Sequence, residues 1–341
     1  MDTLVEYSGV PAEVRLGVAG IRQTVRVSTN PQEQEPTTPT KPFLRWAGGK
    51  RQLLPTLFAA FPRDFSLREN RYFEPFVGGG AVLMALPNSQ FWSDDNQTER
   101  KIFINDANQD LITTYELLRN QPKRLVTALG ELAQDISPER YYEIRASRPK
   151  TKTDIAARFI YLNRLCFNGL HRVNSKGEFN VPYGKLKNPK VCDERLLLAV
   201  SEVLKKAEIS QGGFETAVAT ARKGDLVYFD PPYVPLTATA SFSSYSVAGF
   251  NEGDQRRLAR VIDKLVARGV RVMLSNSSAS LTRQIYQDGL SLFALRAKRS
   301  ISASSGSRQA VDEVLGLSYG LSDCANPAAL GHLRSLKQLS L

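Results

Sequence analysis

The sequence predicts an α/β fold built on an open sheet of buried strands. Two observations support this class. From Arg71 to Leu274, short apolar runs of strand length alternate with stretches whose apolar residues recur at helical spacing. A long, basic and mostly helical stretch interrupts this alternation over residues 123–205. We interpret that stretch as an insertion between two halves of the sheet.

Each expected element has its own local signal. Strands are expected where a short apolar run meets turn-forming or polar residues, over 71–76, 101–104, 225–229 and 271–274. Helices are expected where apolar residues recur at helical spacing, over 81–86, 108–119 and 251–268. Asn251 is a preferred residue at a helix start, and Gly269 is a preferred residue just after a helix end. Loops are expected over 168–188 and 234–250.

The charge of the chain indicates a polyanionic partner. The 341 residues carry a net charge of +11, with a pI near 9.6. Residues 139–190 hold twelve Lys and Arg against four Asp and Glu, and so eight of the eleven net charges. A basic block of this kind is typical of a nucleic-acid surface, although a solvated basic face remains an alternative.

The composition argues against several other classes of protein. Three cysteines without paired spacing and two histidines make a zinc site unexpected and fit a reducing cytosol. We see no signal peptide and no long apolar run, so we expect a protein that is neither secreted nor membrane-spanning. The predicted location is the cytoplasm, in association with the nucleoid.

The segment Asp230-Pro231-Pro232-Tyr233 follows an apolar strand and suits a flat base that carries an amino group. The Asp230 carboxylate can accept one amino hydrogen, and the Pro231 carbonyl, in a stiff segment, can accept the other. Accepting both hydrogens draws the nitrogen lone pair out of conjugation. Tyr233 can stack on the ring. A strand followed by a simple Pro-Pro turn is the alternative.

Two further segments predict a nucleoside site. Residues 74–80, EPFVGGG, form a strand-to-helix turn whose glycines let a ligand approach the backbone. This segment is not a dinucleotide fingerprint and has no phosphate-binding Lys-Ser/Thr, so S-adenosylmethionine fits better. Asp106 ends the next strand, where an acid can accept hydrogen bonds from ribose hydroxyls. A tight turn and a surface acid are the alternatives.

Six segments in one order resemble the Dam-type DNA adenine-N6 methyltransferases over about residues 41–320. They read KPFLRWAGGK, EPFVGGGAV, FINDANQDL, FIYLNRLCFNGLHRVNSKGEFNVPYGKLKNP, DLVYFDPPY and FNEGDQRRLARVIDKLVARGVRVMLSNS. The resemblance implies a Rossmann-like, S-adenosylmethionine-dependent methyltransferase sheet with an inserted helical target-recognition domain. The implied organisation is a disordered extension (1–40), a catalytic domain (41–120 and 206–320), the insertion (121–205) and a tail without an assigned role (321–341).

The resemblance also implies roles for residues at matching positions. Catalysis is expected from Asp230, Pro231, Pro232 and Tyr233. Cofactor binding is expected from Trp46, Lys50, Phe76, Gly78, Gly80, Asp106 and Asp230. DNA binding is expected from Asn168, Leu170, Arg172, Asn180, Pro182 and Tyr183. Arg172 is expected to contact a guanine edge and Leu170 to wedge into the duplex.

The implied activity is transfer of a methyl group from S-adenosylmethionine to the N6 amine of adenine in double-stranded DNA. GATC is the expected site, with base flipping, direct transfer and no metal. We expect a monomer, with a restriction endonuclease as a possible genetic but not physical partner. The alternatives are a cytosine-N4 methyltransferase, an RNA adenine methyltransferase and a catalytically idle DNA-binding regulator.

Overall fold

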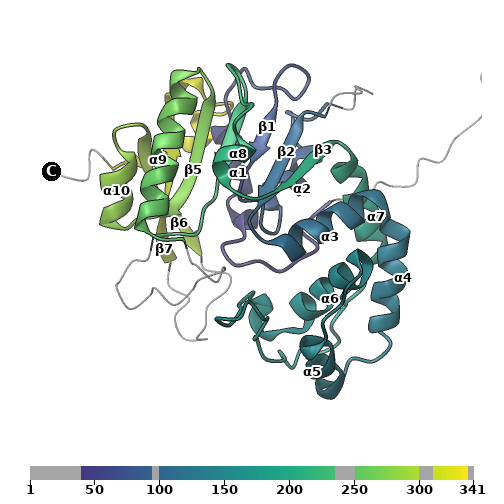
Figure 1. Cartoon of the computed structure of the whole chain (residues 1–341). Coiled ribbons are helices and arrows are strands. Elements are labelled where there is room, and N and C mark those ends of the chain that lie inside the picture. The colour runs from purple at the N-terminus through teal and green to yellow at the C-terminus, as the bar shows by residue number, and fades with distance from the viewer. Residues whose placement is uncertain (1–39, 94–99, 235–249, 299–309, 337–341) are drawn as a thin grey trace, which may run out of the picture. The chain divides into compact units, whose positions relative to one another are not determined.

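A mixed sheet with a parallel central part organises the chain, in agreement with the predicted fold class (Figure 1). The computed structural model describes residues 40–93, 100–234, 250–298 and 310–336, which belong to one compact unit. Among these residues the strand order is β3-β2-β1-β4-β5-β7-β6-β8. The strands are β1 (Tyr72–Glu74), β2 (Ile102–Asp106), β3 (Ala207–Gln211), β4 (Leu226–Phe229), β5 (Arg271–Ser277), β6 (Ser291–Lys298), β7 (Ala310–Leu317) and β8 (Arg334–Ser335).

The centre of the sheet creates a crevice at the carboxyl ends of its strands. Strand β1 pairs in parallel with both β2 and β4. Strands β2 and β3 therefore lie on one side of β1, and β4 and β5 lie on the other side. Ligands of open α/β sheets bind at such a switch point. The residues that directly follow β1, β2 and β4 are therefore brought to one place.

Strand β4 shows why the central strands read as continuous apolar runs. Its four residues are all buried. Leu226 and Tyr228 pack into one hydrophobic cluster, whereas Val227 and Phe229 pack into the other. Successive side chains of a strand point to opposite faces, so this separation indicates that both faces of the sheet are covered.

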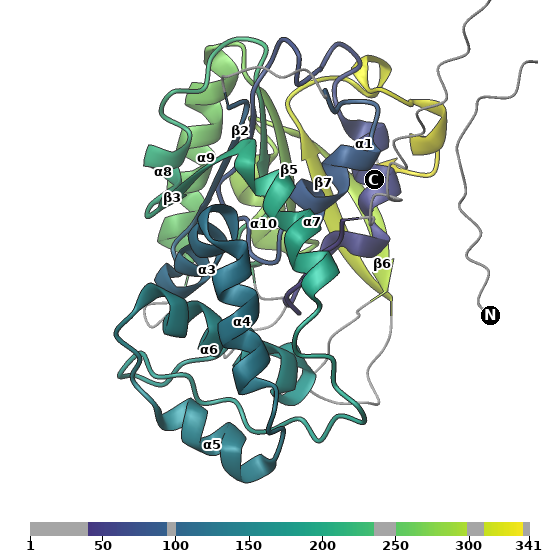
Figure 2. The same cartoon turned by 90° about the vertical axis from the view of Figure 1, so that its right-hand side faces the viewer.

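Helices surround the sheet and extend away from it on one side. They are α1 (Leu54–Ala60), α2 (Ala81–Ala85), α3 (Gln109–Asn120), α4 (Pro122–Leu132), α5 (Pro138–Ala146), α6 (Lys152–Leu165), α7 (Glu194–Lys205), α8 (Phe214–Ala217), α9 (Glu252–Ala267) and α10 (Ser280–Tyr286). Figure 2 shows α5 lying farthest from the sheet, beyond α4 and α6. Helix α3 packs against both α6 and α7. The proposed limits of an inserted domain at 121 and 205 stay a prediction.

The helices expected over 251–268, from its capping residues, and over 108–119, from its apolar spacing, are confirmed to within one residue at each end. Asn251 caps α9 in a reciprocal capping box with Asp254, and Gly269 adopts a φ of +77° after the helix end. Asn108 caps α3 by accepting from the Leu111 amide. The predicted loop over 234–250 lies outside the described residues except at its two ends.

Residues 321–336 belong to the fold, a feature that the sequence did not indicate. Strand β8 pairs with β6, and Cys324 forms a backbone bridge with Pro62. Leu330 is fully buried in the main core. The predicted disordered extension over 1–40 lies outside the described residues apart from Thr40, whose hydroxyl donates to the Met84 carbonyl.

A buried ion pair joins the starts of β1 and β4. The Arg71 guanidinium donates to the Asp225 carboxylate at 2.6 and 3.0 Å and to the Thr220 carbonyl at 2.6 Å. The same carboxylate accepts from the backbone amides of Arg71 and Arg222. Asp225 is 2% exposed, so this carboxylate is satisfied entirely by protein donors.

Replacing Asp225 with Ala should lower the free energy of unfolding by about 3–5 kcal/mol, because the Arg71 charge would stay buried without its partner. Chemical denaturation followed by circular dichroism measures this change. Glu208→Ala is the matched control, since its pair with Arg100 is half exposed and should be worth less than about 1 kcal/mol. Equal losses in the two variants would contradict the prediction.

Candidate functional site

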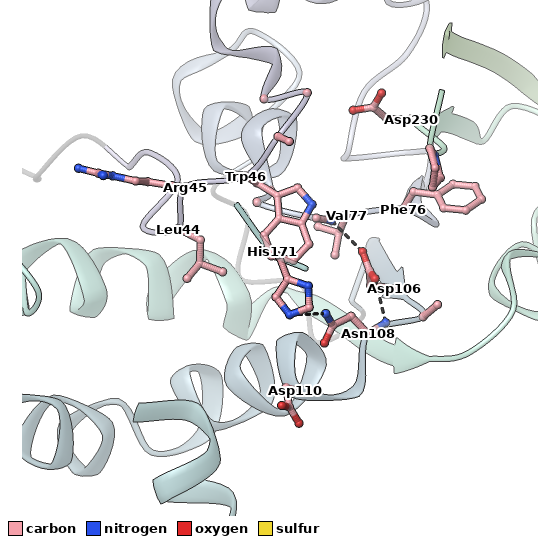
Figure 3. A pocket seen from close by; sticks show the side chains of 18 of the residues that line it. Leu44, Arg45, Trp46, Phe76, Val77, Asp106, Asn108, Asp110, His171 and Asp230 are labelled. Atoms are coloured by element: carbon pink, nitrogen blue, oxygen red, sulfur yellow. Dashed lines mark hydrogen bonds between the residues drawn. The ribbon is translucent and has the colours of Figure 1, made fainter. Parts of the chain in front are cut away.

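A cavity of about 1680 Å³ lies at the carboxyl ends of β1, β2 and β4 (Figure 3). Its wall includes every residue that the sequence suggested for catalysis or cofactor binding. They are Trp46, Lys50, Phe76, Gly78, Gly80, Asp106, Asp230, Pro231, Pro232 and Tyr233. None of the six residues suggested for DNA contact lines this cavity. The chain between them does reach the cavity, because His171, Val173 and Phe179 are lining residues.

Asp230 directly follows β4 and lines the candidate site. Its carboxylate lies 2.8 Å from the Lys50 ammonium. Burial raises the pKa of Asp230 to about 6, and the positive charge of Lys50 acts in the opposite direction. Asp230 is therefore mostly ionised at neutral pH and able to accept hydrogen bonds.

Lys50 is positioned by the turn that precedes it. The chain passes through Gly48 with a φ of +73°, and the Lys50 ammonium donates to the Gly48 carbonyl. The same ammonium lies 4.9 Å from the centre of the Tyr233 ring. Only 3% of the Lys50 side chain is exposed. Through its contacts with Asp230 and Tyr233, Lys50 links the segment before the sheet to the Asp-Pro-Pro-Tyr turn.

The Asp-Pro-Pro-Tyr turn is held by residues that the sequence analysis did not identify. The Tyr233 hydroxyl donates to Glu313 of β7 at 2.8 Å. The Gln255 amide of α9 donates to the Pro232 carbonyl at 2.8 Å, and Asn276 of β5 accepts from the Val234 amide at 3.0 Å. The polar run Ser275-Asn276-Ser277 that follows the apolar run of β5 and is itself buried was the available signal.

The glycine loop after β1 is closely packed. Gly78 and Gly80 have φ values of +48° and +66°. A Cβ atom at Gly78 would lie 2.7 Å from the Trp46 indole nitrogen. Asp106 accepts from the Gly78 amide at 3.0 Å and from the Asn108 amide at 2.9 Å. The loop, Trp46 and the end of β2 therefore form one rigid wall of the cavity.

Glu74, the last residue of β1, is a further acid on the cavity wall, in addition to Asp106 and Asp230. Burial raises its pKa to about 8, the hydrogen bond from Tyr72 lowers it, and the negative charge of Asp230 raises it. Glu74 is thus largely protonated at neutral pH. Asp230 and Glu74 differ in charge because only Asp230 contacts Lys50 directly.

Two of the residues suggested for DNA contact, Arg172 and Asn180, lie at the ends of a short hairpin over residues 172–180, named here the recognition hairpin. Val173 forms a backbone bridge with Phe179, and the Asn180 amide donates to the Arg172 carbonyl at 3.1 Å. The Arg172 side chain is exposed, and its Nε donates to Asn180 Oδ1 at 2.7 Å. This bond fixes the orientation of the Arg172 guanidinium on the surface.

The turn before the hairpin presents an aromatic ring that the sequence analysis passed over. Phe167 is 41% exposed, one of two large hydrophobic side chains among the described residues with this much exposure. Leu170, suggested as the wedge, is half-buried and packs against the core. Asn168 has a φ of +54° within this turn. An aromatic residue beside Asn-Gly was the available signal.

The remaining suggested residues support this surface from one side. The Pro182 carbonyl accepts from the Phe167 amide at 2.9 Å. The Tyr183 ring lies 5.4 Å from the ring of Tyr141 on α5. In the part of the chain that the structure describes, no cluster of His, Cys, Asp and Glu could hold a metal ion. No described helix is long and apolar enough to cross a membrane.

Comparison with known proteins identifies the family. The model of the D12 class N6 adenine-specific DNA methyltransferases matches residues 46–301. The type II methyltransferase M1.LlaDCHI of Lactococcus lactis is 41% identical over 288 residues, which cover 82% of this chain and 96% of the relative. The type II methyltransferase M.MjaIII of Methanocaldococcus jannaschii is 41% identical, covering 82% and 99%. The DNA adenine methylase of Escherichia coli is 36% identical, covering 81% and 94%. The chain therefore belongs to the D12 class N6 adenine-specific DNA methyltransferases and is an enzyme that methylates adenine in DNA.

Proposed function

We propose that this enzyme methylates the adenine of GATC in double-stranded DNA, after flipping that base into the cavity beside Asp230. The observation that carries the proposal is the position of the Asp-Pro-Pro-Tyr turn on the cavity wall, with Lys50 at 2.8 Å from Asp230. An amine acceptor, a stacking ring and a cation converge there. A base inside a duplex cannot reach such a site without leaving the stack.

Asp230 and the Pro231 carbonyl are proposed to accept the two amino hydrogens of the flipped adenine. This arrangement localises the lone pair on N6, which then attacks the methyl carbon directly. S-adenosylmethionine, if bound in the same cavity, would supply the methyl group, and Asp230 is positioned to take the proton that the amine loses. Tyr233 stacks on the base, a contact worth about 1–3 kcal/mol, and its hydrogen bond to Glu313 fixes the ring beforehand.

Membership of a methyltransferase family implies S-adenosylmethionine as the methyl donor, and the cavity residues fit that molecule. Bound there, it supplies a sulfonium methyl group. Gly78 and Gly80 give it access to the backbone, and Phe76 and Trp46 line the same cleft. Lys50 is proposed to lie near its carboxylate. Its ribose is assigned to Asp106 and its amine to Asp230.

The DNA is proposed to lie against the recognition hairpin. Arg172 would contact a guanine edge in the major groove, because its forked donors match the two guanine acceptors. The exposed Phe167 ring and Leu170 would lie near the site vacated by the flipped base. Asn168, Asn180, Pro182 and Tyr183 complete the surface. The basic residues of the proposed insertion would neutralise phosphates, so binding should weaken with salt.

Two further points follow for the enzyme in the cell. A short palindrome can be methylated one strand at a time, which is consistent with a monomer acting on nucleoid DNA in the cytoplasm. Two of the similar proteins are named type II methyltransferases. A restriction endonuclease of the same specificity is therefore proposed as a genetic partner that does not bind the enzyme.

The wild-type enzyme should place N6-methyladenine in GATC sites of plasmid DNA, and Arg172→Ala should spread methylation to other sequences or abolish it. Loss of one bidentate base contact costs about 1–3 kcal/mol of discrimination. Nucleoside mass spectrometry identifies the base, and GATC-sensitive endonucleases report the site. N6-methyladenine that leaves GATC cleavage unaltered would remove GATC from the proposal, and an unchanged site preference in the variant would remove Arg172.

Asp230→Ala should lower kcat by at least about 100-fold, because it removes an acceptor that acts on the reacting amine. Rapid-quench single-turnover assays with labelled methyl donor measure the rate. DNA binding, followed by fluorescence anisotropy, should largely survive. Asp288→Ala, at an exposed aspartate, is the control and should turn over normally. Equal turnover in both variants would exclude Asp230 from catalysis.

The methylation rate should rise with pH through about 6 and level off above it, because Asp230 must be ionised and its pKa is raised to about 6. Lys50→Met should move this limb to higher pH, since the Lys50 charge lowers the Asp230 pKa. Single-turnover rates at saturating cofactor and DNA, measured from about pH 5 to about pH 9, provide the test. Below the pKa of Asp230, the rate should fall roughly tenfold for each pH unit. A flat profile, or a limb that moves to lower pH in the variant, would contradict this assignment.

A further inference from the structure

His171 directly precedes the recognition hairpin and lines the cavity, as Val173 and Phe179 of the hairpin also do. Its half-buried ring lines the cavity, while the next residue, Arg172, is exposed on the hairpin. The ring stacks on Trp46 with centroids 5.5 Å apart and an interplanar angle of 26°. Phe159 of α6 and Phe179 of the hairpin each lie 5.6 Å away. His171 is therefore held by aromatic rings from separate segments of the chain.

Trp46 transmits the position of this ring to the glycine loop. A Cβ atom at Gly78 would lie 2.7 Å from the Trp46 indole nitrogen, and one at Gly79 would lie 2.9 Å from the Trp46 Cβ. Closely packed groups of this kind cannot shift independently. A movement of the His171 ring therefore requires a response from Trp46 and the loop.

A second, polar connection runs from His171 to the same loop (Figure 3). The Asn108 side-chain nitrogen lies 3.4 Å from His171 Nε2. The Asn108 backbone amide donates to one Asp106 oxygen at 2.9 Å, and the Gly78 amide donates to the other at 3.0 Å. Together with the stacking on Trp46, these contacts connect five residues in a ring, in which each residue contacts the next: His171, Asn108, Asp106, Gly78 and Trp46.

The chemical state of His171 suits a connecting role. Burial lowers the pKa of His171 to about 4, so the ring is neutral at physiological pH. With the Asn108 amide donating, Nε2 is the acceptor and Nδ1 carries the proton. Nδ1 is buried without a hydrogen-bond partner in the described part of the chain. A buried donor of this kind is unfavourable, so a small rearrangement that supplies an acceptor is favoured.

We propose that His171 is a positioning residue that couples the recognition hairpin to the cofactor cleft, so that cognate DNA and cofactor each raise the affinity for the other. This inference rests on the function proposed above. When Arg172 engages a base, the adjacent His171 shifts its contacts with Trp46 and Asn108, and these contacts set the cleft. Coupling between two binding equilibria is reciprocal, so it can be measured from either side.

The test measures binding of sinefungin, which carries no transferable methyl group, in the absence and presence of a duplex with one GATC site. Isothermal titration calorimetry gives both dissociation constants, and their ratio is the coupling factor. We expect a factor of at least about 5 for the wild type. For His171→Ala we expect a factor near 1, with the affinity for each ligand alone changed by less than about threefold.

Two variants separate the coupling from general damage. His332→Ala replaces the second of the two histidines, which is exposed on the C-terminal segment, and should keep the wild-type factor. His171→Phe keeps a stacking ring but loses the Nε2 acceptor, so an intermediate factor is expected. Thermal unfolding verifies that each variant is folded, and if His171→Ala is not, His171→Phe decides the question.

The outcomes are distinguishable. A wild type that binds both ligands without coupling, or a folded His171→Ala variant with the wild-type factor, would overturn the proposal and leave the proposed function intact. A variant that weakens each ligand equally with and without the other would show a purely structural role and would also overturn it. A wild type that binds neither sinefungin nor GATC duplex would instead overturn the proposed function, and this inference with it.

Discussion

The parallel pairing of β1 with both β2 and β4 is the constraint on which the site depends. Because these three strands point the same way, the residues that follow them meet at one edge of the sheet. The glycine loop, Asp106 and Asp230 are separated by long stretches of sequence and still share one cavity wall. The backbone hydrogen bonds between the strands, and not the side chains of these residues, therefore bring the three segments together.

Electrostatics then distinguishes residues of the same type within that cavity. Asp230 and Glu74 are both acids at the ends of neighbouring strands. Asp230 contacts the Lys50 ammonium, whereas Glu74 meets the Tyr72 hydroxyl in a more buried position. One acid is consequently charged at neutral pH and the other is largely neutral. A single negative charge on these two acids avoids repulsion between two carboxylates.

The polar residues behind the Asp-Pro-Pro-Tyr turn come from elements far along the chain. Gln255 on α9, Asn276 on β5 and Glu313 on β7 each hold one group of the turn. A site that is oriented before the substrate arrives needs less reorganisation during the reaction. Family membership assigns the reaction to adenine rather than cytosine. The three hydrogen bonds hold the Asp-Pro-Pro-Tyr turn in one position.

The sequence by itself predicted the fold class, the family and ten of the residues that line the cavity. Buried runs such as Leu226–Phe229, the capping pair at Asn251 and Gly269, and the Asp-Pro-Pro-Tyr segment are local signals, because their meaning depends on neighbours along the chain. Only the tertiary structure revealed the antiparallel insertion of β7 between β5 and β6, and the packing of Leu330 into the core. The same holds for the stacking of His171 on Trp46 and the charge difference between Asp230 and Glu74. Each of these features depends on contacts between residues that are distant in sequence. Such contacts produce no periodic pattern of apolar residues, so they cannot be recognised in the sequence alone.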